Sequence, residues 1–255
     1  MRPDERWTAG VLGHFQVNEH VEAYTQLMYT EAQSAWQIAP SGSFFRADSL
    51  SCDNALLSEQ QVQVLCGDYG LGPGDRQSVF IGRRSVESGP RQTELRHRSY
   101  RALFSLRGKI DDTWRYDIYA QYAELKLKQT YDEDMLLSHI FRALEVTSDP
   151  ESGQPVCKSV LDGSDPDCVP WNIFTEGGVT PEALDYLQVQ TSSRGFTDQT
   201  VFSAYVAGNL ERYGIRSPLA ATGMDLVLGV EYREENLDYA PDENLRAGDV
   251  AGYSA

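Results

Sequence analysis

Four cysteines are the residues whose type and spacing most clearly predict covalent chemistry in this chain. Cys52 and Cys66 lie in one long segment, and Cys157 and Cys168 lie in another. Each pair can close a short loop, which lowers the conformational entropy of the unfolded segment. An even cysteine count in such segments is typical of an oxidising compartment, such as the periplasm or the cell surface. We therefore predict two disulfides, Cys52–Cys66 and Cys157–Cys168.

Other reactive side chains do not form a recognisable catalytic or metal-binding pattern. The cysteine spacings are too wide for zinc knuckles, and the histidines (His14, His20, His97 and His139) are scattered. Neighbouring acids, as in Asp111-Asp112 and 132–134, would point to opposite faces of a strand and could not readily share a proton or a metal. The glycine-rich residues 70–74 lack the Lys-Ser/Thr of a phosphate-binding loop, and no nucleophile elbow is present. We predict no enzyme, no catalytic residue, no cofactor and no metal.

The elements that must position these residues are long, alternating strands. Residues 98–124 contain two runs in which one row of side chains is apolar and the other polar, with Leu103 as the exception, and a polar turn over residues 108–112 joins them. Each run is close to the roughly 9–11 residues of a tilted transmembrane strand. The apolar row consists of Tyr100, Ala102, Phe104, Leu106, Trp114, Tyr116, Ile118, Ala120 and Tyr122. An antiparallel sheet of a soluble protein, with one face in water, would give the same pattern.

Two more hairpins follow the same design, over residues 8–17 with 21–32 and over 201–213 with 225–236. The links between hairpins, 33–96 and 128–197, are too long for structureless loops in a compact soluble domain. Short turns at one end and long loops at the other are typical of outer-membrane barrels. We therefore predict an all-β fold: a fragment of an antiparallel transmembrane β-barrel, with about six long strands in three hairpins and long extracellular loops.

Short helices are expected only in the long loops, over residues 56–65, 135–146 and 181–187. They either shape a mouth that captures a ligand or simply pack the loops together. The net charge of −16 excludes nucleic acid as a partner, because phosphate binding requires a basic surface.

Several blocks resemble TonB-dependent outer-membrane receptors, in the order of that family. They are ESGPRQTELRHRSYRALFSLRGKIDDTWRYDIYAQYAE, CDNALLSEQQVQVLCG, GQPVCKSVLDGSDPDCVPWNIF, GGVTPEALDYLQVQT, DQTVFSAYVAGNL and SPLAATGMDLVLGVEYREENLDYAPD. The resemblance implies that residues 1–255 are part of a barrel of about 22 strands in the cell outer membrane. It also implies uptake of a scarce nutrient, of the siderophore, cobalamin, haem or carbohydrate class.

The chain departs from the family in showing no signal peptide, energy-coupling box or plug domain. We therefore expect an internal fragment that does not insert, close or transport alone. The partners implied are outer-membrane lipid, the missing plug and remaining strands, TonB through the missing N-terminal part, and a small nutrient. The alternatives are an outer-membrane structural barrel or adhesin, and a secreted, soluble all-β carbohydrate-binding module.

Three sets of residues carry specific expectations. Loop side chains that could contact the nutrient, or equally form loop core, are Trp36, Phe45, Arg46, Tyr69 and Trp171. Side chains expected to face lipid are Phe104, Leu106, Trp114, Tyr116, Ile118, Leu226, Leu228 and Val230. Side chains expected to face the lumen are Arg101, Arg107, Arg115, Asp117, Gln121, Glu231 and Arg233.

Overall fold

The computed structural model describes residues 3–252, apart from the side chains of residues 45–48. Strands contain 55% of the residues and helices 17%, and the sheets are antiparallel, so the predicted all-β antiparallel class is confirmed. The chain divides into two compact units. The sheet unit comprises residues 3–35, 94–129 and 193–240, and the loop unit comprises residues 36–93, 130–192 and 241–252.

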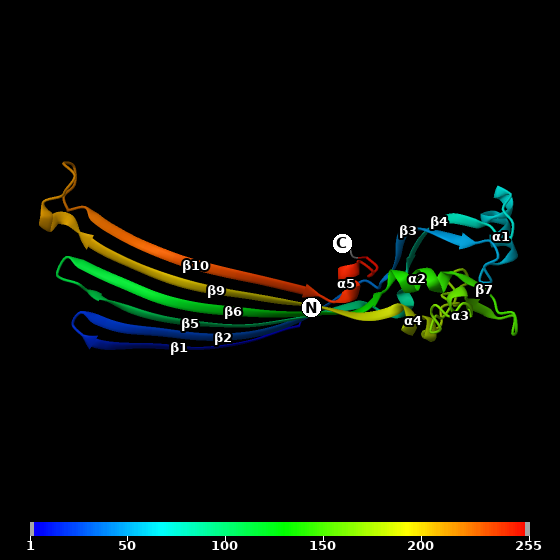
Figure 1. Cartoon of the computed structure of the whole chain (residues 1–255), viewed down its shortest axis with the longest axis horizontal. Coiled ribbons are helices and arrows are strands. Elements are labelled where there is room, and N and C mark those ends of the chain that lie inside the picture. The colour runs from blue at the N-terminus through cyan, green and yellow to red at the C-terminus, as the bar shows by residue number, and fades with distance from the viewer. Residues whose placement is uncertain (1–2, 253–255) are drawn as a thin grey trace. The chain divides into compact units, whose positions relative to one another are not determined.

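A six-stranded sheet dominates the sheet unit, and its long strands run side by side (Figure 1). Their order is β1-β2-β5-β6-β9-β10, so the strands pair in the order of the chain. The strands are β1 (Asp4–Asn18), β2 (Val21–Ile38), β5 (Arg91–Lys109), β6 (Trp114–Met135), β9 (Gln188–Asn209) and β10 (Asp225–Pro241). Among the described residues β1 and β10 form the two edges, and the sheet does not close on itself.

Three hairpins build this sheet, as predicted. Their turns lie at residues 19–20, at 110–113 and at 210–224, and the last contains the 3₁₀ helix η3 (Leu210–Tyr213). The strands are 15 to 22 residues long, which exceeds the predicted runs. The largest difference is in β9, which begins at Gln188 rather than at Val201. Backbone pairing continues there through polar residues, which a search for apolar alternation does not detect.

Two short turns pack against each other at one end of the strands. The Nδ1 atom of His20 lies 2.9 Å from the carbonyl oxygen of Lys109, and the Tyr116 hydroxyl donates to the His20 carbonyl at 3.2 Å. Gly108 makes this approach possible, because a Cβ atom there would lie 1.8 Å from the His20 carbonyl oxygen. The first turn is thereby attached to the second hairpin.

The loop unit contains short helices, as predicted, and also strands that the sequence analysis did not predict. Helices α2 (Leu137–Leu144) and α4 (Pro181–Leu187) coincide closely with their predicted ranges. Helix α1 (Glu59–Leu65) begins three residues late, because Ser58 and Gln61 form its capping box. The helices are α1 (Glu59–Leu65), η1 (Gly67–Tyr69), η2 (Val86–Ser88), α2 (Leu137–Leu144), α3 (Lys158–Leu161), α4 (Pro181–Leu187) and α5 (Glu243–Ala247). The strands are β3 (Gly42–Ser51), β4 (Arg76–Arg84), β7 (Val146–Ser148) and β8 (Pro155–Cys157), and they pair as β3–β4 and β7–β8.

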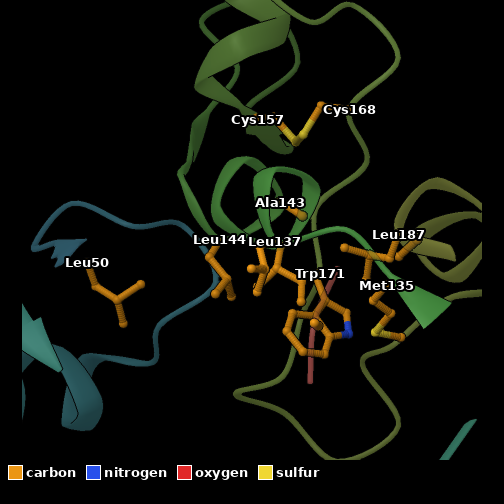
Figure 2. Packing of buried hydrophobic residues seen from close by; sticks show 12 residues of the cluster. Leu50, Met135, Leu137, Ala143, Leu144, Cys157, Cys168, Trp171 and Leu187 are labelled. Carbon is orange, nitrogen blue, oxygen red and sulfur yellow. A yellow bond between two sulfur atoms is a disulfide. The ribbon is translucent and has the colours of Figure 1, made fainter. Parts of the chain in front are cut away.

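The core of the loop unit gathers around α2 (Figure 2). Ile140, Ala143 and Leu144 of this helix are buried with Trp171 and Leu187, which come from distant positions in the sequence. Helices of four to eight residues are not stable alone in water. The stability of α2, α3 and α4 therefore depends on this shared core, to which each of them contributes side chains.

Replacing Leu144 with alanine tests this core. Leu144 is 1% exposed, so Leu144→Ala should lower the free energy of unfolding by about 2–5 kcal/mol. The matched control is Leu161→Ala, since Leu161 is 49% exposed, and its effect should stay within about 0.5 kcal/mol. Hydrogen exchange of the α2 amide groups measures both, and equal effects would contradict the assigned core.

Candidate functional site

One face of the six-stranded sheet carries polar side chains that bond across every pair of neighbouring strands. In strand order, the hydrogen-bonded pairs are Thr8–Thr30 (3.4 Å), Glu22–Arg107 (2.9 Å), Ser105–Asp117 (3.0 Å), Gln121–Gln199 (3.0 Å) and Gln199–Glu235 (2.7 Å). Successive side chains of a strand point to opposite faces, so these contacts fix which residues share the polar face. We call it the polar face of the sheet.

The opposite face carries exposed apolar side chains on every strand, and we call it the apolar face. Val11 and Leu27 are register partners on β1 and β2, and Phe104 and Ile118 continue the row on the second hairpin. Phe202 and Val230 belong to the third hairpin, and these six side chains are between 43% and 75% exposed. Contiguous exposed apolar patches of this kind are rare on soluble monomers. The face therefore requires a partner or an apolar medium.

Aromatic side chains mark both ends of the apolar face. Towards the short turns, the Trp114 Nε1 donates to the Tyr213 hydroxyl at 3.1 Å, and the ring lies so close to Gly208 that a Cβ there would be 2.6 Å from it. Towards the long connections, the rings of Tyr100 and Tyr122 lie 6.0 Å apart. Trp114 and Tyr122 are eight residues apart on β6, or roughly 27 Å at about 3.4 Å per residue.

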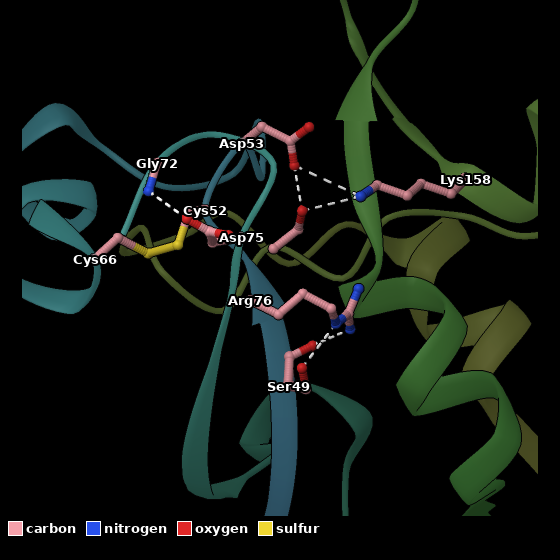
Figure 3. The surroundings of a disulfide bond; sticks show 9 residues. Ser49, Cys52, Asp53, Cys66, Gly72, Asp75, Arg76 and Lys158 are labelled. Atoms are coloured by element: carbon pink, nitrogen blue, oxygen red, sulfur yellow. Dashed lines mark hydrogen bonds and ion pairs between the residues drawn. A yellow bond between two sulfur atoms is a disulfide. The ribbon is translucent and has the colours of Figure 1, made fainter. Parts of the chain in front are cut away.

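Both predicted disulfides are present and lie in the loop unit. Cys52–Cys66 and Cys157–Cys168 have Cα–Cα distances of 6.0 and 6.1 Å, and together they account for all four cysteines. Figure 3 shows that Cys52–Cys66 joins the end of β3 to the end of α1. The disulfides therefore hold the segments that carry the most irregular structure.

Charged side chains link the surroundings of Cys52–Cys66 to more distant segments (Figure 3). Lys158 contacts the Ser51 hydroxyl at 3.0 Å and the Asp53 carboxylate at 3.5 Å. The hydrogen bond from Ser51 and then the charge of Lys158 hold the pKa of Asp53 below its usual range. Arg76 bonds both Ser49 and Glu145. These contacts join residues of the loop unit that are far apart in the sequence.

A second polar cluster lies beside α2 and α4. The Tyr186 hydroxyl donates to Asp165 at 2.7 Å, and the Arg142 guanidinium donates to the same carboxylate at 3.0 Å. The Tyr186 hydrogen bond and the Arg142 charge lower the pKa of Asp165, while burial and the carboxylate raise the pKa of Tyr186. The rings of His139 and Tyr186 stack at 4.3 Å.

The structure separates the loop residues proposed as ligand contacts. Trp171 is fully buried in the loop-unit core, so of the two alternatives it is a core residue, whereas Tyr69 is 69% exposed. Trp36 is half-buried in the last part of β2. The side chains of Phe45 and Arg46 lie outside the described part of the structure.

Acids that are neighbours in the sequence bond different partners in the structure, and Asp111-Asp112 lie in a turn rather than in a strand. Asp111 accepts hydrogen bonds from the amides of Thr113 and Trp114 and so shapes the turn after β5. Asp132 bonds Gln190, and Glu133 bonds Gln188. Within the described residues no group of three or more His, Cys, Asp or Glu side chains could hold a metal ion.

The sequence analysis missed five basic side chains on the apolar face. Arg96 and Arg98 of β5, Lys126 and Lys128 of β6, and Arg194 of β9 line one groove of about 420 Å³. Their spacing in the sequence could have revealed them. The two members of each pair on β5 and β6 are two residues apart, and they alternate in step with the apolar row.

No protein family, curated protein or solved structure matches this chain. In the described residues, no helix has both the length and the apolar character needed to cross a membrane.

Replacing Asp165 with asparagine tests the polar cluster through pH. Hydrogen bonds to a charged group contribute about 1.5–3 kcal/mol, so Asp165→Asn should lower the free energy of unfolding by that order at pH 7. Because folding lowers the pKa of Asp165, its contribution is present above about pH 5 and is lost as pH falls through the folded-state pKa.

Urea unfolding at several pH values measures this effect. The difference in the free energy of unfolding between Asp165→Asn and the parent should shrink as the pH falls below about 4. The control, Asp167→Asn, changes an exposed acid two residues away and should show little effect at any pH. A difference that does not depend on pH would rule out the charge as its origin.

Proposed function

We propose that this chain forms part of the β-barrel of a TonB-dependent receptor in the outer membrane. The single observation that carries the proposal is the two-faced sheet: six long strands with an exposed apolar face and a cross-linked polar face. In a barrel wall the apolar face contacts lipid and the polar face lines a wet lumen. Phe104 and Ile118 then face lipid, and Arg107 and Asp117 face the lumen.

In the proposed membrane, the energetic cost of a charged side chain differs between the two faces of the sheet. A charge that faces lipid near the midplane is destabilising by roughly 2–4 kcal/mol, whereas a charge in a wet lumen is not. The polar face holds Glu22, Arg107 and Asp117 in the strand segments opposite the apolar row. The reverse arrangement would turn the Asp117 carboxylate towards lipid, whereas Glu22 and Arg107 lie close to the short turns.

The two sheet edges support a larger barrel. Strands β1 and β10 each have one neighbour among the described residues, and unpaired edges are costly in lipid. Further strands of the same barrel would satisfy them. The proposed partners are therefore these strands, a plug domain that contacts the polar face, TonB acting through the plug, and outer-membrane lipid.

Nutrient uptake is the receptor part of the proposal, and it is supported by the loop unit. Two disulfides and a separate core hold the segments between hairpins in a defined structure, and disulfides are typical of oxidising compartments. In outer-membrane barrels the long connections face outwards. The exposed Tyr69 is then available to stack on a siderophore, cobalamin, haem or carbohydrate.

Thiol labelling tests the barrel. Single cysteines at Phe104, Ile118 or Leu228 should resist a membrane-impermeant maleimide, because lipid covers the apolar face. Cysteines at Arg115, Gln121 or Glu231 should react, because the lumen is wet and none of these side chains is buried. The native cysteines do not interfere, since all are in disulfides. The reverse pattern would place the register off by one residue, and a soluble monomer labelled on both faces would contradict the membrane proposal.

Uptake tests the receptor. Cells that make the complete receptor, of which this chain is the proposed part, should accumulate one labelled ferric siderophore, cobalamin, haem or oligosaccharide. An uncoupler of the inner membrane should abolish accumulation, because the energy comes from there. If the cysteine at Phe104 is protected from labelling but the nutrient accumulates passively and the uncoupler has no effect, the protein is a simple porin instead.

A further inference from the structure

Among the described side chains of the loop unit, Phe80 is the most exposed aromatic. Its side chain is 76% exposed, although it lies in the middle of β4. Val79 and Ile81, on either side of it, pack against the core of the loop unit. Because successive side chains of a strand alternate, Phe80 points away from that core. The packing of the loop unit therefore does not account for this ring.

Small residues surround Phe80 on the outward face of the β3–β4 sheet. Ser78 and Gly82 lie two positions away on β4, and Ala47 is the register partner of Phe80 on β3. The Cβ atoms of such partners are about 4.5–5.5 Å apart, so a bulky residue at one of these positions would cover the ring. With small residues there, the ring is left as an accessible apolar platform.

Polar groups without net charge lie beside this platform. Ser49 and Ser78 are register partners next to Phe80. Arg76 donates to the Ser49 hydroxyl at 2.7 Å and to the Glu145 carboxylate at 2.9 Å. The Arg76 side chain is 46% exposed and its charge is balanced by Glu145. The pair can therefore donate and accept hydrogen bonds from an uncharged ligand.

The charge of the loop unit restricts the ligands that it can bind. Residues 36–93, 130–192 and 241–252 contain 21 Asp and Glu residues against 8 Lys and Arg residues, so they carry −13 of the net charge of −16. Five of these eight cations form ion pairs with acids of the same unit: Arg76, Arg83, Arg91, Arg142 and Lys158. A surface of this charge repels anionic ligands.

The platform and the charge together distinguish between the classes of nutrient. Haem carries propionates, cobalamin carries a phosphate and ferric catecholates are anionic, so the negative surface disfavours each of them. A ferric trihydroxamate is uncharged, but it presents no flat row of C–H groups. A pyranose ring has such a row, which contacts the negative face of an aromatic ring, and its hydroxyls bond nearby polar groups.

We propose that Phe80 stacks on one pyranose ring of an uncharged oligosaccharide, and that this is the class of nutrient taken up. The inference rests on the proposed function, because only a receptor takes up the ligand that its loops bind. Ser78 and the Arg76–Glu145 pair bond hydroxyls of the same sugar. Phe80 thus supplies the apolar contact, and its neighbours supply the polar ones.

Calorimetric titration of the complete receptor, of which this chain is the proposed part, tests the inference in a detergent without a sugar headgroup. The uncharged probes are maltoheptaose, cellohexaose, xylohexaose and laminarihexaose. The competing classes are hexagalacturonate, haemin, cobalamin, a ferric tris-catecholate and a ferric trihydroxamate. At least one uncharged oligosaccharide should bind, and the competing classes should not.

Three variants locate the contact. Phe80→Ala should bind that oligosaccharide about tenfold more weakly, which corresponds to about 1.4 kcal/mol, because the stacking surface is lost. Phe80→Trp retains an aromatic face and should bind like the parent. The matched control, Leu161→Ala, removes another exposed apolar side chain of the loop unit and should also bind like the parent. Equal urea midpoints of all variants show that the fold is intact.

Each outcome decides the inference. Binding of an anionic probe or of the trihydroxamate in place of the oligosaccharides overturns it, as does the failure of all four oligosaccharides to bind. Equal binding by Phe80→Ala and the parent overturns Phe80 as the platform. Labelling of cysteines at Phe104 and Gln121 measures the proposed function separately. Protection at Phe104 without oligosaccharide binding overturns only this inference, whereas oligosaccharide binding by a soluble monomer labelled at both positions overturns the receptor and leaves the Phe80 contact.

Discussion

The strand register of the six-stranded sheet is the constraint on which the other features depend. Because side chains alternate, a slip of one residue would exchange the two faces of a strand. Arg107 would then leave Glu22 and enter the row of Phe104. The cross-strand polar bonds, the aromatic ends and the five basic side chains that line the groove on the apolar face all agree with a single register. Each of them therefore supports the assignment of the others.

The loop unit is held together in a different way. Its helices are too short to be stable alone, and its two-stranded sheets β3–β4 and β7–β8 are marginal units in water. A buried core, two disulfides and long-range ion pairs such as Arg76–Glu145 supply the missing stability. A rigid unit can present exposed residues such as Tyr69 with little loss of entropy on binding. Under the proposed function, such a unit would lose less entropy on binding a ligand than flexible connections would.

The sequence predicted the hairpins and the disulfides well, because both depend on local patterns. The alternation of apolar and polar side chains around Phe104 and Ile118 is visible in the sequence. Pro181 indicates the start of helix α4, because proline is favoured in the first helical turn. The hairpin β3–β4 was missed because its strands are separated by the α1 segment, so their pairing is not a local signal. The burial of Trp171 depends on contacts with α2, which the sequence does not specify.

Charge on the apolar face distinguishes the two ends of the strands. Beyond Tyr122, β6 continues into Lys126 and Lys128, whereas Trp114 at its other end is preceded by a turn with Asp111 and Asp112. In the proposed membrane, the basic end is the one from which the long connections leave. Under the proposed function, the length of these connections assigns this end to the outer surface. The basic side chains then lie on the same side of the membrane as the long connections, beyond the interfacial tyrosines Tyr100 and Tyr122.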